Sequence, residues 1–523
     1  MPESINERDE LHRVIWKIAD GLRGSVDGWD FKQYVLGSLF YRYISENLST
    51  YVDNNQKEAG VKGFSYAKLP NKIAEQARGQ LVEEKGFFIL PSELFCNVAD
   101  KCELDENLNI TLGKIFTNIE NSAMGTSSEN DFKGLFDDVD VNSKKLGGTV
   151  TEKNKRLCTL LKSIAEMKLG DFQDNKIDAF GDAYEYLMTM YAANAGKSGG
   201  EFFTPQEVSE LLAKLALIDY NSKEKNYKRT VNKVYDPACG SGSLLLKFAK
   251  LLGADNVKQG YFGQEINLTT YNLARINMFL HDVNFSKFNI AHGDTLIDPK
   301  HWEDQPFDAI VSNPPYGLNW ESNENPLLIN DERFAPAGVL APKSDADYAF
   351  VMHMLYWLSS DGTAAFVESP GILFRSGAEQ KIRQYLVSNN YVDTVIMMPK
   401  NLFFGTNIQT CIMTLRKNKV DNSILLVDAT KYCDKSGKKS KLLPNHIEKI
   451  IEIVRKKENS DVSVVVDLKS LEAKNFDLRI SAYQEVKVEK KETRTIDEVI
   501  RDLKNADEKY VSLLSEVEKL IKK

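Results

Sequence analysis

The sequence predicts an α/β protein in which an all-α amino-terminal domain precedes a largely parallel sheet and a C-terminal helical tail follows it. Three observations support this fold class. Apolar residues recur at helical spacing before residue 165, short apolar strands alternate with helices from roughly residue 230 to 430, and the last forty residues carry a seven-residue apolar repeat. Such sheets bind ligands beyond the carboxyl ends of their strands, so motifs placed there are the first functional candidates.

The first domain, residues 1–165, is predicted to be helical. Its apolar stripes fall within residues 11–22 and 31–44, and a glycine-containing turn signal at residues 24–28 separates them. Nothing in this domain indicates chemistry of its own.

One stretch of the first domain resembles a calcium loop only in part. Asp138, Asp140 and Asn142 have the first three spacings of such a loop. However, Ser143 stands where the turn needs glycine, and Thr149 stands where a bidentate glutamate is needed. We therefore expect no metal site.

The second domain, residues 166–480, is predicted from strands that alternate with helices, which is typical of a sheet covered on both faces. Helices are predicted over residues 244–252 and 268–281, for instance. The strand candidates are Val231–Tyr235, Gln259–Gln264, Phe307–Ser312, Thr363–Glu368, Val392–Met397, Thr410–Leu415 and Ile424–Val427.

The tail, residues 485–523, is predicted to be one amphipathic helix with two interleaved apolar series. The two series are Ile496, Leu503, Tyr510 and Val517, and Val499, Ala506, Leu513 and Leu520. Such a helix either packs on its own domain or docks on the helices of a partner, and we expect the second role, in subunit assembly.

Bulk composition restricts the function classes. The net charge is −8, whereas a protein that grips DNA alone usually carries a basic surplus, so either basic groups cluster on one face or a partner supplies phosphate contacts. The polar, acidic start has no secretory apolar core, and no run is long enough to span a membrane. The six cysteines form no CxxC pair, so we expect free thiols in a reducing cytoplasm.

A glycine-rich turn follows the first predicted strand and indicates a nucleoside cofactor. It runs from Asp236 through Pro237, Ala238 and Cys239 to Gly240, Ser241, Gly242 and Ser243. Glycines allow close backbone approach to a ligand and a sharp entry into a helix. Glu265 ends the next strand, at a spacing suited to accepting hydrogen bonds from ribose hydroxyls, and Asp294 is suited to accepting one from an adenine amine. Alone, either acid also fits a solvated surface position.

A second glycine-rich segment, residues 197–207, precedes that turn. It places Phe202 and Phe203 beside a predicted helix start. Thr204 and Glu207 have capping-box spacing, and Pro205 takes the first helical position. It is not a phosphate loop, because Tyr191 stands where the leading glycine is required.

The tetrapeptide Asn313-Pro314-Pro315-Tyr316 follows another predicted strand and is suited to holding a planar amine. The side-chain oxygen of Asn313 and the carbonyl of Pro314 can accept the two amine hydrogens, and the prolines stiffen the loop. Tyr316 can stack on a base. Together with the glycine turn, this predicts methyl transfer from S-adenosylmethionine to an exocyclic nitrogen. The donor needs neither a nucleophilic side chain nor a metal.

In duplex DNA the target amine lies inside the base stack, so the base must be rotated out. A second aromatic wall would help to hold it. Phe403 and Phe404 follow a predicted strand and are candidates for this stacking, although both also suit a core position.

At these residues the chain resembles the modification (methyltransferase) subunit of type I restriction–modification systems, an N6-adenine DNA methyltransferase family. The resemblance covers nearly the whole length. It rests on residues 11–16, 28–37, 201–205, 236–243, 313–316 and 343–350. Asn407 to Thr410 depart mildly from the family, which more often has glycine and proline there.

The resemblance implies a Rossmann-like S-adenosylmethionine-dependent domain that methylates N6 of adenine in DNA. It implies cofactor contacts from Glu201, Phe202, Phe203, Thr204, Pro205 and Gln206, from Ser241, Gly242 and Ser243, and from Glu265. It also implies that two copies assemble with one specificity subunit, and that a restriction subunit joins for cleavage in a bacterial or archaeal cytoplasm.

Three alternatives stay open at this point. Protein glutamine methyltransferases share the tetrapeptide but are usually much shorter. A ribosomal RNA guanine methyltransferase is a related rival, and a non-catalytic assembly subunit is the third. Cytosine C5 chemistry needs a Pro-Cys dipeptide, and none occurs in the sequence.

Overall fold

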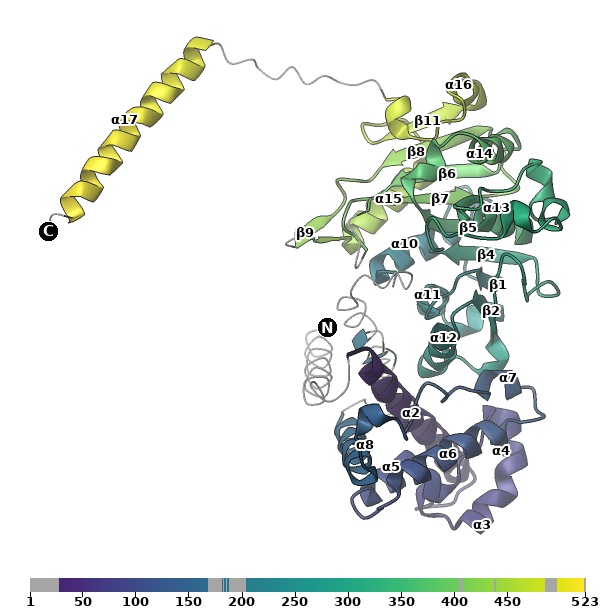
Figure 1. The fold of residues 1–523 in the computed structure, drawn as a ribbon. Helices are drawn as coiled ribbons and strands as arrows, with labels where there is room; N and C mark the ends of the chain where they lie inside the picture. Colours follow the sequence, from purple (N-terminus) through teal and green to yellow (C-terminus); the bar gives the residue numbers. More distant parts are fainter. Residues whose placement is uncertain are drawn as a thin grey trace. The chain divides into compact units, whose positions relative to one another are not determined.

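The computed structural model describes residues 28–167, 181, 183–184, 186–187, 204–403, 408–436, 439–484 and 496–521 (Figure 1). The chain divides into two compact units, one ending at Ala482 and the other beginning at Tyr483. The apolar stripe at residues 11–22 lies outside the described residues. Among those described, no helix combines the length and apolar character that a membrane span requires.

The amino-terminal part is helical, as the sequence predicts. Its longest helix, α2, buries Leu39 and Phe40 completely, in agreement with the stripe at residues 31–44. Helix α8 begins with a capping box in which Thr149 and Glu152 satisfy each other's backbone N–H groups. The helices are α2 (Gly28–Glu58), α3 (Asn71–Ala74), α4 (Arg78–Lys85), α5 (Phe95–Lys101), α6 (Leu108–Ser122), α7 (Glu129–Phe132) and α8 (Val150–Ala165).

A nine-stranded sheet in the order β11-β8-β6-β7-β5-β4-β1-β2-β3 forms the centre of the second part. The run from β3 to β5 is parallel throughout. Strand β7 is antiparallel to both neighbours, and β11 is antiparallel to β8. The strands are β1 (Val231–Asp236), β2 (Val257–Glu265), β3 (Phe288–His292), β4 (Phe307–Ser312), β5 (Leu358–Glu368), β6 (Val392–Met397), β7 (Cys411–Leu415), β8 (Ser423–Asp428) and β11 (Ser463–Asp467), with a separate pair β9 (Asp434–Ser436) and β10 (Lys439–Lys441).

Every predicted strand is present, and four strands were not among the predictions. Strand β3 and strand β11 join the large sheet, while β9 and β10 form their own short ribbon. Strand β5 also begins five residues earlier than predicted, at Leu358, in polar sequence. The missed strands and the added start of β5 are short or polar at their ends, so their apolar pattern is too weak to predict a strand.

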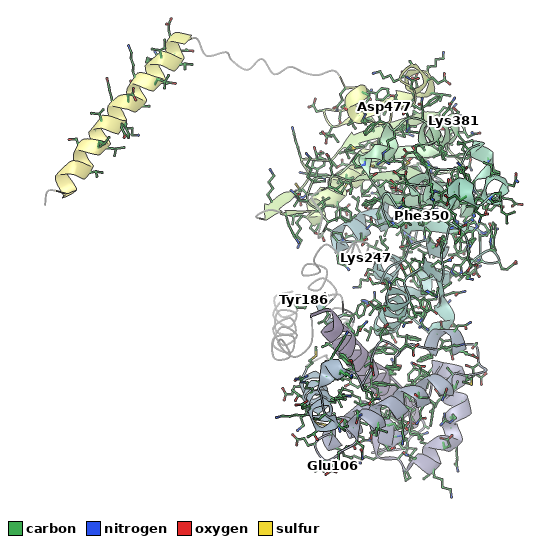
Figure 2. All side chains as sticks on the ribbon, in the orientation of Figure 1. Glu106, Tyr186, Lys247, Phe350, Lys381 and Asp477 are labelled. Carbon is green, nitrogen blue, oxygen red and sulfur yellow. A yellow bond between two sulfur atoms is a disulfide. The ribbon has the colours of Figure 1, made fainter. Side chains whose placement is uncertain are left out.

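Both faces of the sheet are covered. On one face, Val234, Val311 and Val367 join a core with residues of α10 (Gln206–Ala216), α11 (Ser243–Leu252) and α15 (Pro444–Lys456). On the other face, Tyr235 stacks on Phe307 with ring centroids 4.5 Å apart. Helix α13 (Asp347–Trp357) packs there and buries Phe350, which Figure 2 labels. The remaining helices are α12 (Leu268–Leu280), α14 (Ala378–Ser388) and α16 (Leu468–Ala473).

The helical part contacts the sheet part through α12. Phe279 lies between Phe40 and Phe132, with ring centroids 5.9 and 4.9 Å away. Asp138, from the loop with partial calcium-loop spacing, accepts hydrogen bonds from Thr269 at 2.9 Å and Asn272 at 3.2 Å. This carboxylate therefore holds α12.

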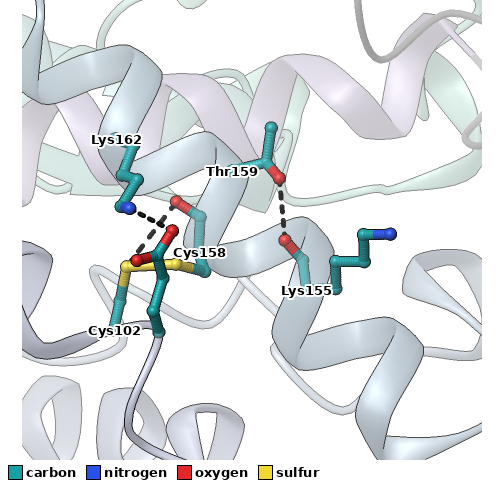
Figure 3. Close-up of a disulfide and its surroundings, with 6 residues drawn as sticks. Cys102, Lys155, Cys158, Thr159 and Lys162 are labelled. Carbon is teal, nitrogen blue, oxygen red and sulfur yellow. Dashed lines mark hydrogen bonds and ion pairs between the residues drawn. A yellow bond between two sulfur atoms is a disulfide. The ribbon is translucent and has the colours of Figure 1, made fainter.

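The expectation of six free thiols is wrong for two cysteines. Cys102, which caps α5, and Cys158 of α8 form a disulfide with a Cα–Cα distance of 5.3 Å (Figure 3). The two cysteines are 56 residues apart, so only tertiary packing brings them together. The other four cysteines, Cys96, Cys239, Cys411 and Cys433, are free thiols.

The second unit contains helix α17 (Ile496–Ile521). Its apolar series stays exposed: Leu503 is 61% exposed, Tyr510 65% and Leu513 54%. The helix predicted from the heptads is therefore present, and these apolar residues are exposed on the unit itself.

Candidate active site

The candidate site lies where the order of the sheet reverses. Strand β1 pairs with β2 on one side and with β4 on the other, all in parallel. The chain therefore leaves β1 at a topological switch point, where open α/β sheets bind their ligands. The glycine turn follows β1, Glu265 ends β2, and Asn313 follows β4. The structure thus brings these predicted residues to one edge of the sheet.

The glycine turn has the backbone conformation that its sequence indicates. Gly240 and Gly242 have φ values of +53° and +75°, which favour glycine. The turn packs so closely on β2 that a Cβ atom at Gly263 would lie 2.9 Å from the Cys239 sulfur. Helix α11 begins at Ser243, so its first N–H groups face the same edge.

Glu265 ties the second strand to this turn. One of its carboxylate oxygens accepts a hydrogen bond from the Gly240 N–H at 3.0 Å, and the other accepts one from the Asn267 N–H at 2.8 Å. These two bonds orient the carboxylate beside the glycine turn.

Asp236 is completely buried at the end of β1. One of its oxygens accepts hydrogen bonds from Ser312 at 2.8 Å and from the Ala238 N–H at 3.0 Å, and the other has no partner among the described residues. Burial raises the pKa of Asp236 to about 7, and the nearby Glu265 charge adds to this. Ser312 directly precedes Asn313, so Asp236 joins the glycine turn to the loop of residues 313–317, which is called the target loop below.

Asp294 follows β3, and its loop is anchored on two sides. Its carboxylate accepts a hydrogen bond from the Leu296 N–H at 2.9 Å. The Thr295 hydroxyl donates to the Pro237 carbonyl at 2.6 Å, which joins the loop to the glycine turn. Arg333 donates to the carbonyls of Thr295 at 2.8 Å and Leu296 at 2.7 Å.

Arg333 is a residue that the sequence did not single out. It is 1% exposed, pairs with Asp331 at 2.7 Å, and donates to the Nδ1 atom of His353 at 3.1 Å. Because a guanidinium only donates, Nδ1 is the acceptor of a neutral imidazole, and Nε2–H faces the Tyr235 hydroxyl at 3.0 Å. Burial and then the Arg333 charge hold the pKa of His353 well below its usual value. An arginine that follows two acidic residues in a loop has the sequence appearance of a surface group.

Asn313 is the centre of the target loop. Its side-chain nitrogen donates to Thr204 Oγ1 at 3.1 Å, and its side-chain oxygen accepts a hydrogen bond from the Tyr316 hydroxyl. The residue remains partly exposed, as do Pro315 and Tyr316, whereas Pro314 is buried. The amide oxygen has two lone pairs, so it can accept a further hydrogen bond.

The capping box predicted for Thr204 and Glu207 is not formed. Helix α10 begins one residue later, with Pro205 at the cap position and no side-chain cap. The Thr204 hydroxyl accepts from Asn313 instead, because the fold places β4 beside this segment. Gln206 opens the helix, and neither its side-chain oxygen nor its nitrogen has a partner among the described residues.

Asp347 supports the target loop from behind. It is 1% exposed and accepts hydrogen bonds from the Gly317 N–H at 2.8 Å and the Ser369 hydroxyl at 3.1 Å. Burial raises the pKa of Asp347 to about 7. In the sequence, Asp347 lies in the block of residues 343–350, which carries the family resemblance but gives no separate signal for this role.

Some of the predicted aromatic and cofactor-side residues lie outside the described residues. These are Glu201, Phe202, Phe203 and Phe404. Phe403 is 3% exposed and belongs to the core. Phe403, one of the two phenylalanines predicted to stack on the base, therefore packs in the core.

Two family models and several known proteins match this chain. The family model "N-6 DNA Methylase" matches residues 175–492, and the model "HsdM N-terminal domain" matches residues 11–164. The type I restriction enzyme MpnII methylase subunit of Mycoplasma pneumoniae is 44% identical, over 98% of this chain and 97% of that protein. The MjaVII methylase subunit of Methanocaldococcus jannaschii is 29% identical, over 98% of this chain and 83% of that protein.

Solved structures give the same result. The type I restriction–modification methyltransferase subunit from Streptococcus thermophilus superimposes with a TM-score of 0.81 at 32% identity, covering 91% of this chain and 100% of that one. A chain from a type I restriction–modification complex shares the fold, with a TM-score of 0.63 at 18% identity over 98% of this chain and 99% of that one. The glutamine, ribosomal RNA and assembly-only alternatives are not favoured. The chain belongs to the N-6 DNA methylase family, among the methylase subunits of type I restriction enzymes.

Proposed function

We propose that this chain transfers a methyl group from S-adenosylmethionine to N6 of adenine in a specific DNA sequence. The observation that carries the proposal is the position of Asn313. It follows β4 at the switch point, one residue after Ser312, which bonds Asp236 beside the glycine turn. A target amine held at Asn313 is therefore next to the proposed cofactor site.

The residues at the switch point suit this cofactor. Gly240 and Gly242 keep the turn free of Cβ atoms, and Glu265 offers acceptors for ribose hydroxyls. The unpartnered oxygen of Asp236 is an acceptor beside the same turn. We assign cofactor contacts to these residues, to Ser241, Ser243 and Asp294, and to the segment of Glu201, Phe202, Phe203, Thr204, Pro205 and Gln206.

When bound, the cofactor supplies an electrophilic methyl group on a sulfonium. The chain then has to orient the amine and direct its lone pair. Asn313 Oδ1 and the Pro314 carbonyl accept the two amine hydrogens, which moves the nitrogen towards tetrahedral geometry. Tyr316 stacks on the extruded base, a contact worth roughly 1–3 kcal/mol. We assign the catalytic role to Asn313, Pro314, Pro315 and Tyr316, and further stacking to Phe404.

We propose further that the chain works as the modification subunit of a type I complex in the cytoplasm of a bacterium or archaeon. Its partners are DNA, a specificity subunit that reads the sequence, and a restriction subunit, with two copies of this chain per specificity subunit. The net charge of −8 fits a protein whose partner makes much of the phosphate contact. The exposed apolar face of α17 fits docking on a partner's helices.

The test is to co-express the chain with its neighbouring specificity gene in a host without adenine methylation and to map N6-methyladenine genome-wide. We expect methylation confined to one sequence motif, and none when the specificity gene is omitted. Absence of N6-methyladenine with both genes expressed would overturn the proposal.

A further inference from the structure

Glu368 is a buried carboxyl group that the mechanism above does not use. It is the last residue of β5 and is 0% exposed. Neither of its side-chain oxygens has a hydrogen-bond partner among the described residues. Buried polar groups in native structures are nearly always hydrogen-bonded, and a group that is not calls for a functional explanation.

The surroundings of Glu368 are the back of the target loop. Its neighbour Ser369 donates to Asp347, which in turn accepts from the N–H of Gly317, the residue after Tyr316. On the other side, Cys411 pairs with Glu368 in the β5–β7 ladder. The Glu368 carboxyl is close enough to raise the pKa of the Tyr316 phenol, second only to burial as a cause.

Burial, followed by the charges of Asp347 and Asp345, raises the pKa of Glu368 well above its usual value. The neutral carboxylic acid form of Glu368 is therefore favoured. In this form it has a carbonyl oxygen that accepts and a hydroxyl that donates. It can exchange hydrogen bonds with a phenol without moving a charge.

In the free protein Asn313 already has a hydrogen-bond partner within its own loop. Its side-chain oxygen is the acceptor proposed for the target amine, yet the Tyr316 hydroxyl already donates to it. In the proposed complex the ring of Tyr316 stacks on the base, and this movement takes its hydroxyl away from the Asn313 oxygen. The Tyr316 hydroxyl then needs another acceptor, because a buried phenol without a partner is unfavourable.

We propose that Glu368 is a positioning residue that accepts the Tyr316 hydroxyl when the target amine takes its place on Asn313. This inference rests on the proposed function. In the free protein the side-chain oxygens of Glu368 accept no hydrogen bond from the described residues, and in the complex with an extruded adenine Glu368 completes the hydrogen bonding of the loop. It touches neither the cofactor nor the base.

Asp393, another buried carboxylate in the same sheet, provides a comparison, because its role is structural. Asp393 on β6 is 1% exposed and is fully engaged, with Lys457 at 3.2 Å, Tyr220 at 3.1 Å and Arg416 at 3.7 Å. Lys457 and its cationic neighbours hold the pKa of Asp393 below its usual value against the opposing effect of burial. Glu368 differs in having no such partners.

The experiment uses the full-length chain in complex with its specificity subunit and compares Glu368→Leu, Glu368→Gln, Tyr316→Phe and the Glu368→Leu/Tyr316→Phe pair. Single-turnover methylation of a cognate duplex and thermal unfolding are measured for each. We expect Glu368→Leu to slow methyl transfer by about tenfold, the loss of one hydrogen bond, while it raises the melting temperature because an unpartnered buried acid is removed. Glu368→Gln keeps an acceptor and stays close to wild type.

The decisive result is the double variant. Tyr316→Phe removes the hydroxyl from which Glu368 would accept a hydrogen bond. Glu368→Leu should therefore cause no further loss of methylation rate in that background. Asp393→Asn is the control for a structural acid: it should lower the melting temperature and leave the rate unchanged. Equal losses from Glu368→Leu in both backgrounds, a wild-type rate for Glu368→Leu, or a loss in Glu368→Gln equal to that in Glu368→Leu would each overturn the inference. A wild-type complex without methylation would instead overturn the proposed function.

Discussion

The side chain of Asn313 donates a hydrogen bond to Thr204 Oγ1 across 3.1 Å. The two residues lie 109 positions apart in the chain, one after β4 and the other before α10. The bond orients the amide so that its oxygen, not its nitrogen, faces the position proposed for the target amine. It also connects the target loop to the segment expected to contact the cofactor.

This bond can be tested with a change that preserves shape. Thr204→Val removes the acceptor, so the Asn313 amide loses its fixed orientation. We expect kcat for methylation to fall about tenfold, which corresponds to ~1.4 kcal/mol. Thr204→Ser retains the hydroxyl and serves as the control. A similar loss in both variants would show that the methyl group of Thr204, not its hydroxyl, matters.

Asn313 itself should be needed for transfer and not for cofactor binding. Asn313→Ala removes the side-chain acceptor for the amine, and no side-chain atom of Asn313 bonds the glycine turn or Glu265 among the described residues. We expect methylation to be abolished while the Kd for S-adenosylmethionine, measured by calorimetry, stays within about twofold of wild type. Near-normal DNA methylation by this variant would remove the mechanism.

Arg333 should control cofactor affinity through the loop that carries Asp294. Arg333→Met removes the donors to the Thr295 and Leu296 carbonyls, so this loop loses one of its two anchors. We expect the Kd for the cofactor to rise at least about tenfold in protein that remains folded.

The matched control for Arg333 is Arg383, which is also 1% exposed. It donates to the carbonyls of Phe476 at 2.8 Å and Ile372 at 3.0 Å, outside the Asp294 loop. Arg383→Met should lower stability and leave the cofactor Kd unchanged. If both arginine variants weaken cofactor binding equally, the effect is one of general stability.

Asp236 should make stability depend on pH in a defined direction. Its pKa is raised to about 7 in the folded protein, chiefly by burial, and an unfolded aspartate titrates near its ordinary value of about 3.9. Between these two values the folded state binds the additional proton, so the contribution of Asp236 to stability is fully present below about pH 4 and is lost as the pH rises to about 7.

Asp236→Asn removes this titration. The free energy of unfolding of wild type, minus that of the variant, should therefore fall by about 2 kcal/mol from pH 5 to pH 7. Urea unfolding of both proteins without cofactor at several pH values measures this difference. A difference that does not change with pH would show that Asp236 titrates normally.

The carboxy-terminal helix should serve assembly and not folding. A chain without residues 490–523 lacks α17, whose Leu503 and Leu513 are exposed. We expect native mass spectrometry to show weaker complex formation with the specificity subunit, while the melting temperature of the first unit is unchanged. In the full chain, Leu503→Glu with Leu513→Glu should reproduce the loss, and Lys504→Glu should not. Equal complex formation with and without the tail would contradict this role.

Most of the sheet was predictable because strands and turns depend on neighbouring residues. Buried parallel strands such as β4 are short apolar runs, and glycine and proline mark the turns that follow them. The antiparallel direction of β7 was not predictable, because an apolar run of five residues contains no signal of its direction. The short ribbon of β9 and β10 was missed for a related reason, since its residues are polar.

The tertiary structure also reassigned single groups. The Thr204 hydroxyl had the spacing of a helix cap, yet it accepts from Asn313. Asp138 had the spacing of a calcium ligand, yet it holds α12. The spacing of neighbouring residues indicates which hydrogen bonds are possible. The bond that actually forms depends on a competing partner from another segment of the chain.

The sequence by itself determined where the candidate site lies: the glycine turn, Glu265 and Asn313 each lie at the end of a strand, and parallel strands end at one edge. Only the tertiary structure decided what surrounds them. It brought Arg333 to the loop of Asp294 and buried the Glu368 carboxyl with no hydrogen-bond partner among the described residues. Periodicity and turn residues act over a few positions, whereas these contacts join segments distant in the chain, and their geometry exists only once the core has packed.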